Sequence, residues 1–336
     1  MKILAIDVGH GTQDNYLYDS DKNEENCIKV IFPSPSKRLA EEVRRSEGDL
    51  FVYGSQIGGG EFSHALLGHH GRVFITEDCA YTIRNDLEEL KEKGITIVKE
   101  KPLNFKGLFI SEPDFEALMP LLNRFEDRAP DAVAIAVQDH GLYPKGQSNR
   151  KERLRRIRER LEQSRDLSSL LFEYGHIPEY YTRMRSAARN ARKFFENSEI
   201  FLMDTAIAAI AGAAADNALV INLGNGHTMC AAIEDGKVAG MFEHHTRKLD
   251  GEKIRVLVKR FIAHELSDEE VFADGGHGCF YLSDFGEPEE MVVTGPNRRM
   301  IERSGLSFRY AYPMGDAMMS GPAGLIRGIK EKEKFY

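Results

Sequence analysis

The sequence predicts an α/β protein of two domains with a cleft between them, on three observations. The chain has 336 residues, of which 42% are hydrophobic, so it can bury a large core and is long enough for two domains. Apolar, strand-like runs alternate with helical stretches in both halves. Each half also contains an apolar run followed by a loop with glycines at alternate positions, "DVGHGT" at 7–12 and "NLGNGHT" at 222–228.

The first half begins with three strands and then alternates strands with helices. The apolar run Ile3–Ile6 leads into the first glycine loop, and Asn15–Tyr18 and Cys27–Pro33 continue as a meander. Helical and strand patterns then alternate as far as the apolar strand "AVAIAV" at 132–137. This alternation indicates a largely parallel sheet, and we expect residues 1–144 to form the first domain.

The second half repeats this design. A strand that ends at Asp204 precedes an alanine-rich helix, and a further strand leads into the second glycine loop. The dipeptide "DG" at 235–236 is a strong hairpin signal between the two strands that follow. We expect the core of the second domain at 198–311, and we interpret the charged helical segment 145–197 as a basic insertion.

Each glycine loop joins two strands, so neither fits the strand-to-helix GxGxxG fingerprint of dinucleotide-binding proteins. Glycines two residues apart allow backbone N–H groups to approach an anion, because no Cβ stands in the way. Two facing hairpins can hold a polyphosphate, and Asp7 can hold Mg²⁺ through water. The alternative is that both loops are simple tight turns. The candidate phosphate-binding residues are Gly9, His10, Gly11, Thr12, Asn222, Gly224, Asn225, Gly226, His227 and Thr228.

These features resemble the superfamily of actin, the heat-shock-chaperone ATPases and the sugar kinases. Its first phosphate motif, D-x-G-[ST], is matched by Asp7, Gly9 and, less closely, Gly11–Thr12. Its second motif, D-x-G-x-G-x-T, is matched at 222–228 with Asn in place of the Asp. The resemblance implies two ribonuclease H-like (actin-like ATPase) domains, ATP and Mg²⁺ as cofactors, and residues 312–336 as a C-terminal helix that returns to the first domain.

This resemblance implies a role for two further stretches of the sequence. The strand at 291–300 ends in "TGPN", like the adenosine motif of the superfamily, which implies nucleotide contacts by Gly295 and Asn297. Pro296 replaces the usual second glycine of that motif. Asp204 occupies the place of the catalytic base of carbohydrate kinases, while its position before a helix is also typical of an N-cap.

As a whole the chain resembles an archaeal and bacterial family of this superfamily that is sometimes labelled as related to the pyruvate formate-lyase activating enzyme. A radical activating enzyme of that type holds an iron–sulfur centre with clustered cysteines in a CxxxCxxC motif. The four cysteines here are far apart in the sequence, at Cys27, Cys79, Cys230 and Cys279.

Several histidines lie in or beside glycine loops, where imidazoles can bind a transition metal or, when protonated, a phosphate. Their spacing does not decide between these roles and simple loop hydrogen bonding. Gly58–Gly60 precede a helix whose amino terminus can bind an anion, although a glycine run is also typical of a flexible connection. The candidate substrate contacts are Asp139, His140, Gly59 and His277.

The net charge of −8 argues against general attraction to nucleic acid or to anionic membranes, so neither is expected as a partner. We expect a cytoplasmic protein, since no signal peptide or long apolar run is present. Leu154, Ile157 and Leu161 recur at helical spacing within a basic stretch, which predicts an amphipathic helix with a solvated or partner-binding face. RNA or a phosphorylated substrate is the alternative ligand of that face.

The resemblance as a whole implies an ATP-dependent phosphotransferase that acts on a small hydroxyl-bearing substrate, with Asp204 as catalytic base and Asp7 near the metal. Two alternatives remain open. One is a nucleotide-gated ATPase that regulates a protein partner bound through the basic insertion. The other is a histidine-based metal-binding protein that has lost ATP binding.

Overall fold

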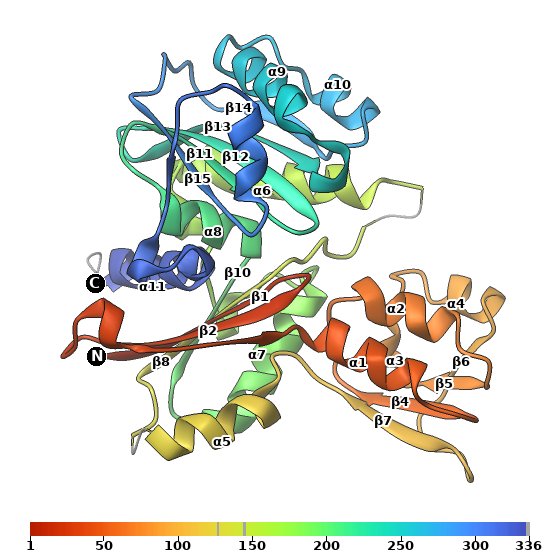
Figure 1. Ribbon diagram of the computed structural model, residues 1–336. Coiled ribbons are helices and arrows are strands. Elements are labelled where there is room, and N and C mark those ends of the chain that lie inside the picture. The colour runs from red at the N-terminus through yellow and green to blue at the C-terminus, as the bar shows by residue number, and fades with distance from the viewer. Residues whose placement is uncertain (126–127, 144–145, 334–336) are drawn as a thin grey trace.

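The computed structural model describes residues 1–125, 128–143 and 146–333, and the expected domain boundary between residues 144 and 145 lies outside this described part. The described residues form two six-stranded sheets and one four-stranded sheet. In Figure 1 the first sheet lies at the lower centre, the second in the upper part, and the third at the lower right.

The first sheet has the strand order β3-β2-β1-β8-β10-β9. β1 is antiparallel to β2 and parallel to β8, as a meander followed by a crossover requires. Side chains of β1 alternate between two cores: Leu4 and Ile6 pack with helices α5 and α7, and Ile3 and Ala5 pack with α8 and α11. The strands are β1 (Lys2–Val8), β2 (Thr12–Asp19), β3 (Ile28–Pro33), β8 (Ala132–Val137), β9 (Phe172–Glu173) and β10 (Glu199–Met203), and the helices are α5 (Phe115–Phe125), α7 (Thr182–Phe194), α8 (Thr205–Ala213) and α11 (Ser320–Glu333).

Strand β10 belongs to the first sheet, because it pairs in parallel with β8, whereas the sequence placed it at the start of the second domain. The segment between β8 and β10 is also divided between the two halves of the molecule. Its β9 and α7 pack on the first sheet, and its helix α6 (Asn149–Ser164) packs against β14 (Gly278–Tyr281) of the second. We therefore propose that the first domain extends to Met203, with α6 as an arm that reaches the second domain.

The second sheet repeats the arrangement of the first, in the order β14-β13-β12-β11-β15-β16. Its first strand, β11, is antiparallel to β12 and parallel to β15, just as β1 is to β2 and β8. This repeated topology confirms the predicted class of two ribonuclease H-like (actin-like ATPase) domains. The elements are β11 (Ala218–Leu223), β12 (His227–Glu234), β13 (Lys237–His245), β14 (Gly278–Tyr281), β15 (Glu290–Thr294) and β16 (Arg309–Tyr310), with α9 (Gly251–Ile262) and α10 (Asp268–Ala273) on the outer face.

A third sheet, all parallel and in the order β6-β5-β4-β7, has its own hydrophobic core. We call residues 35–110 the side subdomain. The sequence analysis did not separate it from the first domain, because strand–helix alternation looks the same in either sheet. Its elements are α1 (Pro35–Arg44), β4 (Leu50–Gly54), α2 (Gly60–Leu67), β5 (Val73–Ile75), α3 (Glu77–Ala80), α4 (Glu88–Glu92), β6 (Ile95–Ile97) and β7 (Lys106–Ile110).

Helices α8 and α11 cross between the first and second sheets (Figure 1). Their backbones approach so closely that a Cβ on Gly212 would lie 1.9 Å from the carbonyl oxygen of Ser320. A Cβ on Gly324 would lie equally close, at 1.9 Å, to that of Ala208. Glycines at 212 and 324 are therefore needed for this crossing. Of the helices in the described part of the chain, none combines the length and the apolar character needed to cross a bilayer.

Candidate nucleotide and substrate site

The two glycine loops have the same geometry. The Gly9 N–H donates to the Thr12 carbonyl at 2.9 Å, and the Gly224 N–H donates to the His227 carbonyl at 3.0 Å. Strand pairing ends at Val8–Gln13 in one loop and at Leu223–Thr228 in the other, so four residues form the turn in each case. We call residues 9–12 the first hairpin and residues 224–227 the second hairpin.

The hairpins face each other, since a Cβ on Gly11 would lie 2.8 Å from the side-chain nitrogen of Asn225. With the amino-terminal end of α11 they enclose a cavity of about 130 Å³, which we call the hairpin cavity. Gly11, Thr228 and Asn297 do not line this cavity. The predicted residues that do line it are Asp7, Gly9, His10, Thr12, Asn222, Gly224, Asn225, Gly226, His227 and Gly295.

Asp7 and Asp14 bring two buried carboxyl groups to the hairpin cavity from neighbouring strands. Burial, together with the charge of Asp14, raises the pKa of Asp7 to about 8. Burial likewise raises the pKa of Asp14 to about 7. Among the described residues no group hydrogen-bonds to Oδ1 of Asp14, whereas Thr205 Oγ1 donates to Oδ1 of Asp7 at 2.5 Å. Two buried carboxyl groups, one incompletely satisfied, fit a hard divalent cation such as Mg²⁺.

Asp14 was missed by the sequence analysis. The available signal was the polar run Gln13–Asn15 inside a strand, where alternation would place apolar residues. All three side chains are buried. The Gln13 side chain connects this strand to the residue before α5, because its side-chain oxygen accepts a hydrogen bond from the Asp114 N–H at 2.9 Å.

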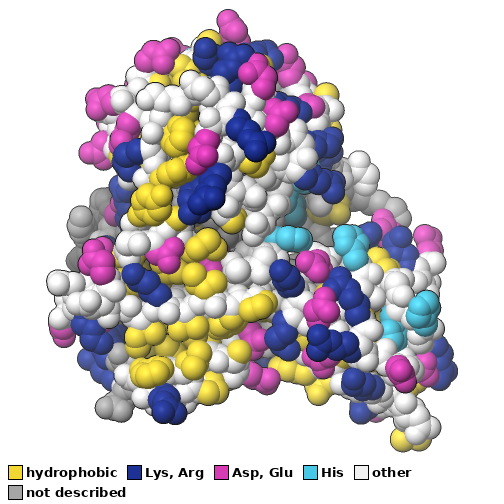
Figure 2. Space-filling model, in the orientation of Figure 1, with side chains coloured by type: hydrophobic (Ala, Val, Ile, Leu, Met, Phe, Trp, Pro, Cys, Tyr) yellow, Lys and Arg dark blue, Asp and Glu magenta, His cyan; other side chains and the backbone are white. Residues whose placement is uncertain are grey.

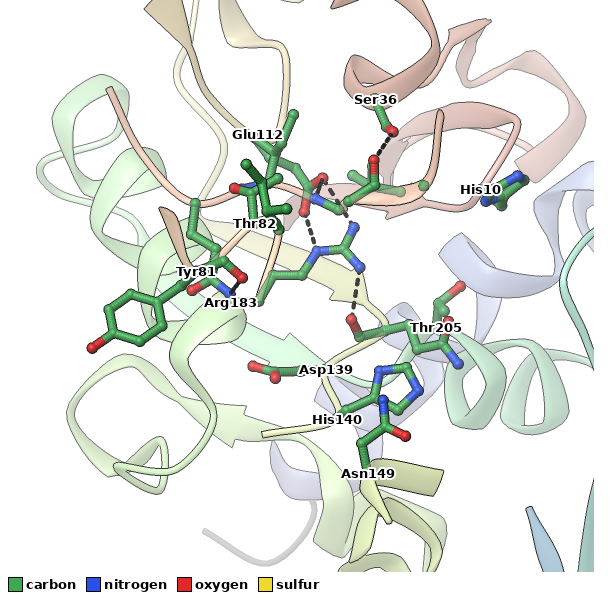
Figure 3. Close-up of a pocket in the computed structure, with 18 of the residues that line it drawn as sticks. His10, Ser36, Tyr81, Thr82, Glu112, Asp139, His140, Asn149, Arg183 and Thr205 are labelled. Carbon is green, nitrogen blue, oxygen red and sulfur yellow. Dashed lines mark hydrogen bonds and ion pairs between the residues drawn. The ribbon is translucent and has the colours of Figure 1, made fainter. Parts of the chain in front are cut away.

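A larger cavity of about 400 Å³ lies between the first domain and the side subdomain, and we call it the substrate cavity. It shares Gly9, His10, Gln138, Thr205 and His227 with the hairpin cavity, so the two spaces adjoin. Its volume is typical of small-molecule sites. Figure 3 shows residues that line it, among them Tyr81, Thr82, Glu112, Asp139, His140, Asn149, Arg183 and Thr205.

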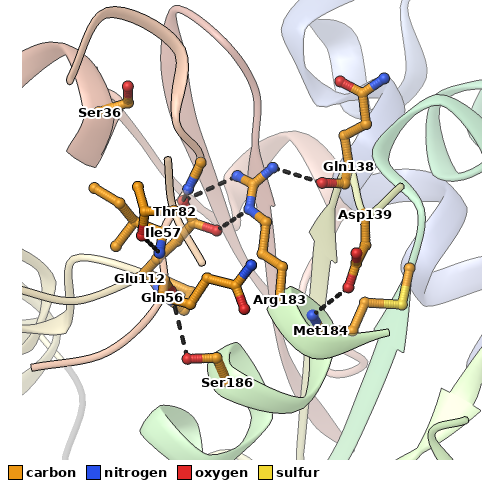
Figure 4. Close-up of polar contacts among 12 residues, drawn as sticks. Ser36, Gln56, Ile57, Thr82, Glu112, Gln138, Asp139, Arg183, Met184 and Ser186 are labelled. Atoms are coloured by element: carbon orange, nitrogen blue, oxygen red, sulfur yellow. Dashed lines mark hydrogen bonds and ion pairs between the residues drawn. The ribbon is translucent and has the colours of Figure 1, made fainter. Parts of the chain in front are cut away.

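An ion pair between Glu112 and Arg183 connects the walls of the substrate cavity (Figure 4). Arg183 donates to the two carboxylate oxygens of Glu112 at 2.7 and 2.9 Å, and to the Gln138 carbonyl at 2.6 Å. Glu112 also accepts from the Gly58 N–H at 2.9 Å. Arg183 is therefore a partly buried link between three segments, although it lies within the segment 145–197 that the sequence indicated as a basic insertion.

The four predicted substrate residues differ in their surroundings. Asp139 is buried, its pKa is raised by that burial, and it accepts from the backbone N–H groups of Gly141 and Met184 at 2.7 and 3.0 Å. It therefore orders the loop that carries His140. Gly59 lies where a Cβ would approach the Thr82 carbonyl to 2.6 Å. Asp139, His140 and Gly59 line the substrate cavity, whereas His277 is fully buried and does not. A substrate role for them stays a prediction.

Asp204 lines neither cavity and is 6% exposed. Arg153 donates to its two carboxylate oxygens at 2.6 and 3.1 Å, and the Ala206 N–H donates to it at 2.9 Å as a helix cap. Arg153 also pairs with the buried Glu243, although its position within the basic stretch had suggested a solvated side chain. The N-cap role is therefore present, and the role of Asp204 as a base stays a prediction.

The "TGPN" stretch supports the second hairpin. Gly295 has a φ of 95°, and a Cβ there would lie 2.5 Å from the Leu223 carbonyl. The Asn297 side chain donates to the Gly224 carbonyl at 3.0 Å, and its backbone N–H donates to Leu223 at 2.9 Å. Pro296 and Gly295 line the hairpin cavity. Nucleotide contacts by Gly295 and Asn297 stay a prediction.

His140, His227 and His277 converge beside the substrate cavity, with one ring nitrogen of each lying within 4.8 Å of the others. The ring of His245 lies 4.7 Å from that of His227, measured between centroids. Burial lowers the pKa of His227 to about 3 and that of His140 well below its usual value, so both imidazoles are neutral. Figure 2 shows histidine side chains at the surface where the upper domain meets the side subdomain.

The sequence itself identifies a family. Residues 57–300 match the model of the family described as "Putative pyruvate format-lyase activating enzyme (DUF1786)". The chain belongs to this family. The match to the DUF1786 family includes the second hairpin, Asp204 and the converging histidines, while the first hairpin precedes it. A search of curated proteins finds no match.

Solved structures similar to this DUF1786 protein align over nearly its whole length at low identity. The ethanolamine utilization protein EutJ from Carboxydothermus hydrogenoformans is 11% identical, with coverage of 97% of this chain and 89% of its own and a TM-score of 0.38. An inorganic polyphosphate/ATP-glucomannokinase from Arthrobacter sp. strain KM is 14% identical, with coverages of 100% and 99% and a TM-score of 0.40. A ROK family glucokinase from Streptomyces griseus, in complex with glucose and AMPPNP, is 10% identical, with coverages of 98% and 99% and a TM-score of 0.39.

The cysteines of this DUF1786 protein are separated in the structure as they are in the sequence. Cys27 follows a short 3₁₀ turn, Cys79 lies in α3, Cys230 in β12 and Cys279 in β14. All four are buried and free. The nearest approach in the sheet puts Cys230 and Cys279 on either side of Phe242, to which both are paired. This arrangement does not supply the clustered thiolates of an iron–sulfur centre.

Proposed function

We propose that this protein binds MgATP between its two hairpins and transfers the γ-phosphoryl group to a hydroxyl group of a small molecule held in the substrate cavity. The observation that carries the proposal is that the hairpin cavity and the substrate cavity adjoin, with His10, Thr205 and His227 in the wall of both. Phosphoryl transfer requires this arrangement, because donor and acceptor must meet in line within a site that excludes water.

The nucleotide side of the site assigns a role to each hairpin. Backbone N–H groups of the two hairpins face the phosphates, and Asp7 and Asp14 hold Mg²⁺, which keeps several of its waters. Asn222 orients one such water. A cavity of about 130 Å³ is too small for a nucleotide, so the contact between Gly11 and Asn225 must open for ATP to enter. Closure around the bound nucleotide then excludes water from the phosphates.

For the acceptor side we propose Asp204 as the base that takes the hydroxyl proton. Arg153 pairs with this carboxylate, so the acceptor must displace part of that pair before transfer. The substrate cavity has a polar wall that includes Glu112, Arg183 and Asn85. Such a wall suits a small molecule with several hydroxyl groups.

Thermal unfolding with and without ATP, ADP and Mg²⁺ tests nucleotide binding. A ligand at 100 times its dissociation constant adds about 2.7 kcal/mol to the free energy of unfolding. We expect an upward shift that needs Mg²⁺ and disappears in Asp7→Ala. The absence of a shift with any nucleotide would refute the proposal. Turnover is tested separately, by measuring the release of ADP in the presence of candidate acceptors. The Asp204→Asn variant should lose turnover and keep the thermal shift. Unchanged turnover in this variant would show that Asp204 is not the base.

The ion pair of Asp204 with Arg153 favours a second candidate function, a nucleotide-gated ATPase that regulates a protein partner. A base held by an arginine gives slow hydrolysis, as a switch requires. The exposed face of α6 is the proposed partner surface, and its Arg155 and Arg158 pair with glutamates on the same helix, which argues against a purely anionic ligand. The test is capture of a protein partner. Capture that needs ATP rather than ADP, and that is lost when the exposed residues of α6 are substituted, supports this function. Capture that is the same with either nucleotide counts against it.

A further inference from the structure

The convergence of His140, His227 and His277 is not required by the proposed nucleotide chemistry, and it brings nitrogen ligands from three distant segments to one place. His140 follows β8 of the first sheet, His227 begins β12, and His277 precedes β14. His140 and His227 also line the substrate cavity. The cluster therefore lies in the wall of a cavity that a small molecule can enter.

Two of the three rings lie beside a second polar group. Gln138 Nε2 lies 3.1 Å from Nδ1 of His227, and the Glu243 carboxylate lies 3.0 Å from Nδ1 of His277. Histidines that ligate metals donate the N–H of one ring nitrogen to an oxygen acceptor while the other nitrogen binds the ion. The Gln138 amide therefore has to turn its oxygen towards Nδ1 of His227 when the ion binds. Both ring nitrogens of His277 are fully buried and, within the described residues, neither has a hydrogen-bonding partner. A buried, unsatisfied ring nitrogen in the cluster indicates a ligand that is external to the chain.

The charges around His277 indicate whether the external ligand of this cluster is a cation or an anion. The carboxylates of Asp204 and Glu243 share the single guanidinium of Arg153, and all three side chains are buried. Two negative charges against one positive charge leave a net negative charge beside His277. A phosphate group is repelled there and a cation is stabilised.

We propose that His140, His227 and His277 form a binding site for a divalent transition metal ion, zinc first, with an open coordination position towards the substrate cavity. Three imidazole nitrogens and one open position are the ligand set of catalytic rather than structural zinc sites. Three nitrogens at about 2.0–2.1 Å from a tetrahedral ion lie about 3.3 Å apart, so the cluster contracts from its spacing of up to 4.8 Å when the ion binds. An oxygen of a molecule in the substrate cavity completes the coordination.

This site is distinct from the proposed magnesium site. It uses nitrogen ligands, which hard Mg²⁺ does not prefer, while Asp7 and Asp14 supply only oxygen. The proposal of a histidine metal site also does not depend on whether the protein binds ATP. The two proposals therefore fail separately: metal content is measured without nucleotide, and the MgATP thermal shift is measured on its own.

The test uses the full chain purified without a histidine tag. Apo protein is titrated with Co²⁺, whose visible absorption reports tetrahedral nitrogen coordination, and Zn²⁺ is then used to displace it, with metal content measured by mass spectrometry. We expect one equivalent per chain in the wild type. The variants His277→Ala and His140→Ala should lose the absorption, and Gln138→Ala should weaken Co²⁺ binding about 10- to 100-fold through loss of its support of His227.

The matched control is His70→Ala, which removes an exposed histidine of the side subdomain and should bind Co²⁺ like the wild type. His277 is fully buried, so its variant is accepted only if its circular dichroism is unchanged; His140 is only partly buried and serves as the second variant. Wild-type protein that takes up less than a tenth of an equivalent overturns the proposal. Undiminished Co²⁺ absorption in a folded His140→Ala or His277→Ala chain overturns it as well.

Discussion

Asp7 and Asp14 lie directly opposite each other on β1 and β2, and both carboxyl groups are buried in the wall of the hairpin cavity. Without a cation, Asp7 retains its proton at neutral pH and Asp14 is about half protonated, because burial raises the pKa of Asp7 to about 8 and that of Asp14 to about 7. The pair is therefore a site where proton and cation compete, and this competition can be measured.

The first prediction concerns the stability of the ligand-free protein. The ordinary pKa of an aspartate, 3.8, applies to the unfolded chain, so the folded state retains a proton that the unfolded state releases. The stability contributed by this proton is fully present below pH 3.8 and is lost as the pH rises through about 8. Asp7 alone contributes a fall of about 1 kcal/mol per pH unit to the free energy of unfolding between pH 5 and 8, so we expect the slopes of the wild type and Asp7→Asn to differ by about this amount. Urea unfolding across this range measures it, and equal slopes for both proteins would contradict the prediction.

A second prediction applies to Mg²⁺ and nucleotide. Because the cation binds the ionised carboxylates, its binding releases their protons, and affinity should rise by about 10-fold per pH unit and per proton until the pH passes 8. The MgATP-dependent thermal shift should therefore be larger at pH 8.5 than at pH 6. ATP alone, without Mg²⁺, is the control. A shift that does not change with pH would show that neither Asp7 nor Asp14 contacts the cation.

The third prediction concerns Gly321, where a Cβ would lie 2.0 Å from Oδ2 of Asp7. The Gly321→Ala change must move either the Asp7 carboxylate or the start of α11, so we expect it to remove the MgATP-dependent thermal shift. Gly328→Ala in the same helix is the matched control, because its Cβ meets only the flexible side chains of Leu171, at 3.3 Å, and Met203, at 3.6 Å. That control should keep the shift. If Gly321→Ala keeps it too, the proposed metal position beside Asp7 is wrong.

These positions show which parts of the site the sequence could supply. The hairpins were predictable because an apolar strand followed by alternate glycines is a local pattern, and Gly9 and Gly224 close their turns in the same way. The repeated strand–helix order likewise predicted the fold class. The side subdomain was not separable, because its βα units have the same periodicity as those of the first domain.

The roles of Arg153 and Arg183 were not predictable for a different reason. The helical periodicity of the sequence does not show whether an arginine faces solvent or pairs with a buried carboxylate. Asp204 is 51 residues from Arg153, and Glu112 is 71 residues from Arg183, so only the folded chain brings each pair together. The catalytic role of Asp204 and the nucleotide contacts stay predictions until turnover and binding are measured.

The fourth prediction follows from the link between Glu112 and Arg183. Glu112 accepts the Gly58 N–H and so fixes the loop of the side subdomain that faces the substrate cavity. In Glu112→Ala we expect faster hydrogen exchange at residues 56–60, by about 10-fold for the loss of one or two charge-assisted hydrogen bonds. Exchange in β5 should not change, since its core does not contain Glu112. Exchange that rises equally in both segments would indicate general unfolding of the subdomain and would contradict a local role.

The last prediction concerns Arg153, whose guanidinium is the shared partner of Asp204 and Glu243. Arg153→Met leaves two buried carboxylates without a cation, and breaking a buried pair in this way costs about 3–5 kcal/mol. Arg155→Met, on the exposed face of the same helix, should cost less than about 1 kcal/mol. Adding Glu243→Gln to Arg153→Met should restore part of the loss, because one of the two uncompensated charges is removed. Denaturant unfolding of the three variants measures these values, and a cost for Arg153→Met no larger than that for Arg155→Met would show that the buried charges do not depend on this arginine.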